Sequence, residues 1–181
     1  VERVEAVPLR RRPGGFTALL RAICGQQLSV ASAEAVWTRL EAAGCCKADG
    51  IARADDDLLR ACGLSRQKIA YARALAGADL DFDALARMPE EDAVAELTAI
   101  KGIGVWTAEV YLMFAVGRPD VFAPGDLALQ ESVRLLFELT HRPKEKALRE
   151  MAGAWSPWRA VAARLLWAYY AAEKSREGVA P

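Results

Sequence analysis

The segment from Leu97 to Glu109 constrains the fold more than any other part of the chain. An apolar pattern with helical spacing runs there into Gly102-Ile103-Gly104, and a second helical pattern begins at once. Glycine at both positions permits a positive φ and the close approach of another backbone. Ile103 between them can enter the core and fix the turn. The pattern predicts a short hairpin that joins two helices.

The amide groups that follow this hairpin suit an anion. The N–H groups of Gly104, Val105 and Trp106 begin a helix, where they lack intrahelical partners and lie at the positive end of the helix dipole. A phosphate can bind there without any side-chain charge. An ordinary turn between helices is the alternative interpretation, because Gly-x-Gly alone is common.

Helical spacing of apolar residues continues through nearly all of the chain, and no run alternates as a strand would. Ser29 and Ser65 can cap two of the expected helices. We expect helices near residues 16–23, 30–44, 55–62, 65–77, 89–100, 105–116, 126–139, 144–154 and 157–174. The predicted class is all-α. Leu59 to Ser65 weakly repeats the hairpin pattern, which predicts a second turn that is structural or a weaker phosphate contact.

The formal net charge is zero, which argues mildly against nucleic-acid binding, where a basic surface is expected. Main-chain donors at the hairpin offer an answer, because they bind phosphate without charged side chains. The basic residues are unevenly distributed, and a solvated face is the simpler interpretation of each cluster. The clusters are Arg10–Arg12, then Arg66, Lys68 and Arg73, then Arg142, Lys144, Lys146 and Arg149.

Other classes of protein are disfavoured. No stretch reaches the roughly 18 apolar residues that a membrane span needs, and residues 1–12 lack the apolar core of a signal peptide. The four cysteines fit neither a disulfide framework nor a zinc site, so we expect them to be small core residues. They are Cys24, Cys45, Cys46 and Cys62. The expected location is the cytoplasm, at the nucleoid and without contact to a membrane.

An aspartate follows the hairpin by about twenty residues. Pro124-Gly125-Asp126 places this acid at the expected start of a helix, where an N-cap is one interpretation. A carboxylate that stabilises positive charge on a sugar is the other. Together, a phosphate-binding hairpin and an acid suggest an enzyme that works on a nucleotide within DNA.

In combination these motifs resemble the helix-hairpin-helix DNA glycosylase superfamily, and most closely its 3-methyladenine DNA glycosylase II branch. The resemblance extends over about residues 13–174, and further similar stretches follow in the same order at residues 16–29, 63–68, 104–109, 117–122 and 155–159. It implies two helical lobes with the active-site cleft between them and no N-terminal β domain. The lobes would comprise about residues 28–116, with the hairpin, and residues 1–27 together with 117–181.

The resemblance assigns the catalytic acid to Asp126. Members that also cut the strand have a lysine where this chain has Trp106, and an indole cannot form a Schiff base. The resemblance therefore implies a monofunctional glycosylase that uses water and has no lyase activity. Trp106 and Trp167 correspond to tryptophans of the base pocket, with core packing as the alternative. Val110 stands where the family often has an aromatic residue, which implies a roomier pocket.

The resemblance also implies how DNA is held. Gln27 corresponds to the residue inserted into the gap left by the flipped base, with a polar helix-boundary residue as the alternative. The hairpin contacts would come from Gly102, Ile103, Gly104, Val105 and Thr107. The backbone carbonyls of Thr98, Ile100 and Ile103 would bind a structural monovalent or other cation. An iron–sulfur cluster is not expected, because no cysteine follows Cys62, and no further cofactor is required.

The predicted function is excision of alkylated bases, of the 3-methyladenine and 7-methylguanine type, from double-stranded DNA, which begins base excision repair. The base would be flipped out of the duplex, and its N-glycosidic bond hydrolysed by a monomer. The alternative is a non-catalytic helix-hairpin-helix module that binds damaged or distorted DNA. An oxidised-base glycosylase is disfavoured by the missing lysine. Trp37, Trp155 and Trp158 are expected to pack, and His141 and Glu109 to lie at the surface.

Overall fold

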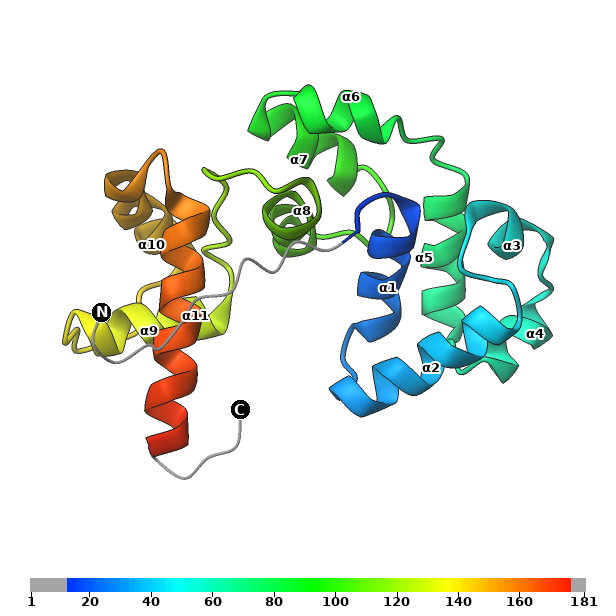
Figure 1. Cartoon of the computed structure of the whole chain (residues 1–181), viewed down its shortest axis with the longest axis horizontal. Coiled ribbons are helices and arrows are strands. Elements are labelled where there is room, and N and C mark those ends of the chain that lie inside the picture. Colours follow the sequence, from blue (N-terminus) through cyan, green and yellow to red (C-terminus); the bar gives the residue numbers. More distant parts are fainter. Residues whose placement is uncertain (1–12, 177–181) are drawn as a thin grey trace. The chain divides into compact units, whose positions relative to one another are not determined.

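The computed structural model describes residues 13–176, and every regular element within them is a helix (Figure 1). These residues form two compact units that divide after Tyr111. We call residues 13–111 the hairpin unit and residues 112–176 the Asp126 unit. The predicted all-α class is confirmed.

The hairpin unit is built around its first helix. α1 contacts α2, α5 and α8, and Leu19, Leu20 and Ile23 on its buried face are inaccessible to solvent. Their spacing puts them on one side of the helix, which is the usual origin of such a core. The helices of this unit are α1 (Phe16–Gly25), α2 (Val30–Ala42), α3 (Ala48–Arg53), α4 (Asp56–Ala61), α5 (Arg66–Ala76), α6 (Phe82–Arg87), α7 (Glu90–Thr98) and α8 (Val105–Tyr111).

The Asp126 unit begins with a π-helix that continues directly from α8. Its core forms where α9 packs against α11, and Ser132 Oγ donates a buried hydrogen bond of 2.8 Å to the carbonyl of Leu166 across that contact. Its elements are η1 (Leu112–Val116), α9 (Leu127–Leu136), α10 (Glu145–Ala152), the 3₁₀ turn η2 (Gly153–Trp155) and α11 (Arg159–Arg176). Within the described part of the chain, no helix is long and apolar enough to cross a bilayer.

The units divide the chain differently from the expected lobes. α1 packs with α2 and α5, so it belongs to the hairpin unit, whereas the sequence favours placing residues 1–27 in the other lobe. The reason is the buried face of α1, whose apolar side chains are enclosed by the helices that follow it. The Arg10–Arg12 cluster lies outside the described residues.

The predicted helix starts are more accurate than the predicted ends. Ser29 Oγ accepts a hydrogen bond from the amide of Ser32, and Ser65 Oγ accepts one from the amide of Lys68, as N-caps do. The helix expected over 105–116 becomes a π-helix from Leu112. The sequence analysis does not predict α3 and α6, because six residues give little periodic signal. α4 has the same length and is predicted, and Asp55 caps it.

Candidate functional site

The hairpin adopts one left-handed residue, at Gly102, with φ of 99°. α7 ends at Thr98, and the amide of Ile103 donates to the carbonyl of Ile100 at 3.0 Å, which closes the turn. A Cβ on Gly102 would overlap the ring of Tyr71 on α5. Ile103 is 4% exposed, so it enters the core as expected. Gly102 is therefore required both for its φ and for the close approach of a ring.

Gly104 differs from Gly102. Glycine permits a positive φ at both positions, but only Gly102 has one. A Cβ on Gly104 would meet no protein atom within 4 Å. The fold itself therefore does not require glycine at this position.

The second turn that the sequence suggests has the same form as the hairpin. Gly63 has φ of 100°, close to that of Gly102, and Leu64 is 3% exposed, close to the 4% of Ile103. Residues that correspond in the two sequence segments therefore have similar conformation and burial. Ser65 stands where the hairpin has Gly104, and its hydroxyl caps α5.

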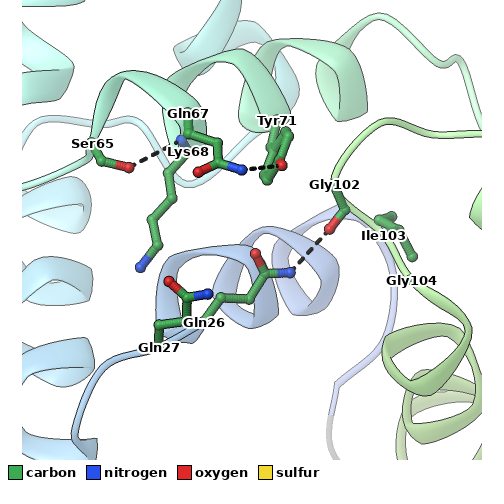
Figure 2. Close-up of a pocket in the computed structure, with 9 residues that line it drawn as sticks. All are labelled: Gln26, Gln27, Ser65, Gln67, Lys68, Tyr71, Gly102, Ile103 and Gly104. Carbon is green, nitrogen blue, oxygen red and sulfur yellow. Dashed lines mark hydrogen bonds between the residues drawn. The ribbon is translucent and has the colours of Figure 1, made fainter.

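The turn after α1 is tied to the hairpin and to α5. Gln26 Nε2 donates to the carbonyl of Gly102 at 3.0 Å (Figure 2). Lys68 Nζ donates to the carbonyl of Cys24 at 2.6 Å. Between these anchors, Gln27 has φ of 57° and an exposed side chain. A positive φ is uncommon for a non-glycine residue and is typical of functional turns.

A hollow of about 420 Å³ lies where these three segments meet (Figure 2). Glutamine side chains from two of the segments line it, together with the backbone of the hairpin. Its lining residues are Gln26, Gln27, Ser65, Gln67, Lys68, Tyr71, Gly102, Ile103 and Gly104. The structure thus brings the predicted wedge residue, Gln27, to the same hollow as the predicted phosphate-binding turn.

α8 presents one face to solvent and buries the other. Val105 and Trp106 are 44% and 47% exposed, so Trp106 is not a core tryptophan. Val110 is half-buried, one helical turn beyond Trp106. Thr107 and Glu109 are buried, at 7% and 2% exposure, because their side of α8 faces the core. The surface position expected for Glu109 is wrong, and the Thr107 side chain does not reach the surface.

In the Asp126 unit, Asp126 is the N-cap of α9. Its Oδ1 accepts hydrogen bonds from the amides of Ala128 and Leu129, each at 3.0 Å, and from Trp167 Nε1 at 3.1 Å. The carboxylate is half-buried and held in one orientation by donors from two helices. The cap interpretation is thus confirmed, and the sequence reasoning missed the hydrogen bond from Trp167.

The loop before Asp126 is anchored by an ion pair that the sequence reasoning did not identify. Asp120 accepts from Arg159 Nε at 2.8 Å, from Arg159 Nη2 at 3.1 Å and from Ser156 Oγ at 2.8 Å. The hydrogen bonds from Arg159 hold the pKa of Asp120 below its usual range. The amide of Ala160 also donates to the carbonyl of Pro119 at 2.9 Å. These bonds join two of the stretches that carry the resemblance.

The remaining tryptophans and His141 can be placed as well. Trp37 is buried, and Trp155 lies edge-on to Phe122 with a centroid separation of 5.5 Å, so both pack as expected. Trp158 is 60% exposed, so the packing expected of it is wrong; it precedes α11 instead of entering the core. His141 is exposed, as expected.

The metal-ligating residue types do not cluster within residues 13–176. Among the described residues, no group of three or more histidine, cysteine, aspartate or glutamate side chains could hold a metal ion. The cysteines are free thiols, and three of them, Cys24, Cys45 and Cys62, are buried. Burial is the main cause that raises the pKa of Cys24 to about 11, which keeps this thiol protonated and inert.

Comparison with known proteins identifies the family of the chain. The model of the HhH-GPD superfamily of base excision DNA repair proteins matches residues 20–157. The chain belongs to this superfamily. The resemblance inferred from the sequence is therefore confirmed at the level of the superfamily.

Individual relatives extend the match. A DNA-3-methyladenine glycosidase from Bacillus halodurans, known from its crystal structure, has 36% sequence identity to this chain. The two structures match with a TM-score of 0.83 over 95% of this chain and 82% of that one. The 3-methyladenine DNA glycosylase Mag1 of Schizosaccharomyces pombe, in complex with abasic DNA, is 29% identical, with a TM-score of 0.80 over 92% and 87%. A putative DNA-3-methyladenine glycosylase of Bacillus subtilis, YfjP, is 30% identical over 84% of this chain, which spans 58% of its length.

Proposed function

We propose that the protein is a monofunctional DNA glycosylase that removes alkylated bases from duplex DNA. The observation that carries the proposal is Asp126, whose Oδ1 is oriented by the α9 amides and by Trp167. The cap of α9 alone does not require a negative charge, because serine, threonine or asparagine also caps a helix, and in a module that only binds DNA the charge would repel phosphates. An oriented acid in a chain of this superfamily supports catalysis.

The chemistry follows from the charge of the substrate. A purine methylated at N3 or N7 is cationic and leaves without further protonation, once it has been flipped from the stack at a cost of a few kcal/mol. As its bond to C1′ breaks, the electron pair stays with the base and the sugar becomes oxocarbenium-like. Asp126 stabilises that charge and accepts a proton from the water that adds to C1′. The products are the free base and an abasic deoxyribose.

Selection of the base is assigned to aromatic faces. Cation–π contacts with Trp106 and Trp167 would each contribute about 0.5–2 kcal/mol toward a cationic ring over a neutral one. The exposure of Trp106 supports this role, because an indole at the surface is available to a ligand. Val110, in place of an aromatic side chain, leaves room for larger adducts.

The hairpin unit is assigned to the DNA backbone and to the gap that a flipped base leaves. Main-chain N–H groups of Gly104 and Val105 would bind a phosphate, and Gln27 would hydrogen-bond the base opposite the lesion. The left-handed turn that exposes Gln27 supports the wedge role, because it is held from both sides by Gln26 and Lys68. We further propose that the protein acts as a monomer in the cytoplasm, at the nucleoid.

The decisive experiment measures the release of methylated bases from alkylated duplex DNA under single-turnover conditions. Asp126→Asn is the informative variant, because asparagine still accepts the amide hydrogen bonds of an N-cap, so the helix survives and the charge alone is lost. We expect this variant to be at least about 100-fold slower. His141→Ala, at an exposed position, is the matched control with unchanged rate.

Two outcomes would contradict the proposal. If the wild-type protein releases no methylated base yet binds abasic DNA, the protein is a binding module. If Asp126→Asn releases bases as fast as the wild type, Asp126 has no catalytic role. Strand cutting without added alkali would contradict the monofunctional assignment, which rests on Trp106 in the place of a lysine.

We also propose that a monovalent cation binds the carbonyls of Thr98, Ile100 and Ile103. Carbonyl oxygens at the end of α7 lack helical partners and suit a hard cation. The carbonyl of Ile100 already accepts from Ile103, and one lone pair on it remains for the ion. Replacing K⁺ and Na⁺ by tetramethylammonium at constant ionic strength should weaken DNA binding; unchanged affinity would exclude a functional cation.

A further inference from the structure

The indole that holds Asp126 is itself held by a second aromatic ring. Phe114 in η1 lies 5.6 Å from Trp167, centroid to centroid, with an angle of 32° between the ring planes. The guanidinium carbon of Arg164 lies 5.1 Å from the centroid of the same phenylalanine. Arg164 and Trp167 are three positions apart on α11, so both lie on the side of that helix that Phe114 contacts. We call these three residues the Phe114 stack.

The π-helix explains why Phe114 can reach this position. An extra residue in the turn rotates the following side chains relative to an α-helix, and such turns are frequent at functional sites. The amides of Gly117 and Arg118 both donate to the carbonyl of Leu112 at 3.0 Å, which ends the element. Residues 112–116 therefore have a defined local structure that directs Phe114 toward α11.

The stack bears on Asp126 through the hydrogen bond from Trp167 Nε1. Two donors to Asp126 Oδ1 are backbone amides of α9, whose positions the helix fixes. The third is Trp167 Nε1, which depends on the rotamer of a side chain. A half-buried indole without a neighbouring ring can turn its N–H away, whereas one packed on Phe114 cannot do so without losing that contact.

We propose that Phe114 is a positioning residue, which keeps the Trp167 N–H directed at Asp126 and is itself clamped by Arg164. The predicted effect on the rate of base release rests on the proposed glycosylase function. The effect on the hydrogen bond between Trp167 and Asp126 does not depend on that function. Phe114 acts through the indole and not by contact with substrate. Its loss therefore slows base release without weakening the binding of DNA.

The kinetic test replaces the ring by an aliphatic side chain. Phe114→Leu should lower the single-turnover rate of base release about tenfold and leave Kd for DNA with an abasic site within about twofold. Phe114→Tyr retains the ring and should restore most of the rate. Trp155→Leu is the matched control, because it breaks the aromatic pair with Phe122 in the same unit, and its rate should equal that of the wild type. An equal fall in Trp155→Leu, or no rescue by tyrosine, overturns the proposal.

A double-mutant cycle tests the route. Trp167→Phe keeps an aromatic ring and removes the N–H, so the variant with both substitutions should be no slower than Trp167→Phe alone. Multiplied defects would mean that Phe114 acts independently of the indole, and the proposal would be wrong.

A readout independent of activity uses the indole N–H signals of ¹⁵N-tryptophan-labelled protein. The signal of Trp167 is identified by its loss in Trp167→Phe. Its exchange with solvent should be slow in the wild type, at least several-fold faster in Phe114→Leu, and unchanged in Trp155→Leu. Unchanged exchange in Phe114→Leu overturns the proposal even if the wild type is inactive, in which case the proposed function fails separately.

Discussion

The two glycines of the hairpin make a matched pair of opposite predictions. Gly102 has φ of 99° and lies against the Tyr71 ring, whereas Gly104 has ordinary φ and open space at the Cβ position. Alanine at position 102 should therefore damage the fold, and alanine at position 104 should damage only the binding of DNA. The same change in chemistry, two residues apart, separates a structural role from a binding role.

The magnitudes follow from the geometry. In Gly102→Ala, a left-handed non-glycine residue costs about 1–3 kcal/mol, and the overlap with Tyr71 adds about 1–3 kcal/mol of overpacking, so the free energy of unfolding should fall by about 2–6 kcal/mol. Gly104→Ala should leave that free energy unchanged or raise it by up to about 1 kcal/mol, because alanine restricts the unfolded chain. A methyl group at the phosphate-binding amides should weaken DNA binding by about 1.4 kcal/mol, or about tenfold.

The assay combines urea denaturation with fluorescence anisotropy on two labelled duplexes, one intact and one with a stable abasic site. Because the phosphate contact reads no base, Gly104→Ala should lose affinity for both duplexes by a similar factor. Wild-type affinity in Gly104→Ala would refute the phosphate contact at this turn. A large loss of stability in Gly104→Ala would refute the view that the fold tolerates a side chain there.

Three further predictions concern other contacts. Gln26→Ala removes the bond to the Gly102 carbonyl, so it should cost about 1 kcal/mol of stability and weaken DNA binding. Gln67→Ala, on the same hollow, removes only an exposed bond to Tyr71 Oη and should cost less stability; equal unfolding midpoints for wild type and Gln26→Ala would contradict this. Asp120→Asn should lower the free energy of unfolding by about 1–2 kcal/mol at pH 7. Because Arg159 depresses the pKa of Asp120, this difference from the wild type is present above the unfolded pKa of about 4 and should vanish as the pH falls through the lower folded pKa. A difference that persists in acid would mean that the charge of Asp120 is not its cause. A plot of log affinity for DNA against log salt concentration should have a slope of magnitude about 2–3, which is smaller than the slope of a protein that makes 6–10 phosphate contacts. A slope near 8 would show that side-chain cations dominate the binding.

The sequence predicts best what is local. The turn at Gly102, the burial of Ile103, and the caps at Ser29, Ser65 and Asp126 follow from residue types over a few positions, and the structure has all of them. Backbone conformation and capping depend on neighbouring residues, so a short pattern contains most of the information.

What the sequence could not predict depends on distant partners. Trp167 lies 41 residues from the Asp126 that it donates to, and Gln26 lies 76 residues from Gly102. Glu109 has the sequence neighbourhood of a surface acid, yet its side of α8 faces the core. The boundary of the units also depended on which helices enclose α1, and no local signal indicates that choice.

The neutral net charge, which at first argues against a DNA-binding protein, becomes consistent once the cations are traced. Lys68 binds the carbonyl of Cys24, and Arg73 binds the carbonyls of Ile51 and Ala54 as well as Asp56. Both cations hold segments of the hairpin unit in place, and Asp56 offsets the charge of Arg73, whereas Lys68 keeps its full charge beside the hollow. Preorganisation adds to this attraction, because amides fixed at a turn cost little to align when a phosphate arrives, whereas a flexible lysine must first be ordered. Under the proposed function, a chain built in this way needs no excess of basic residues to hold DNA at the hairpin.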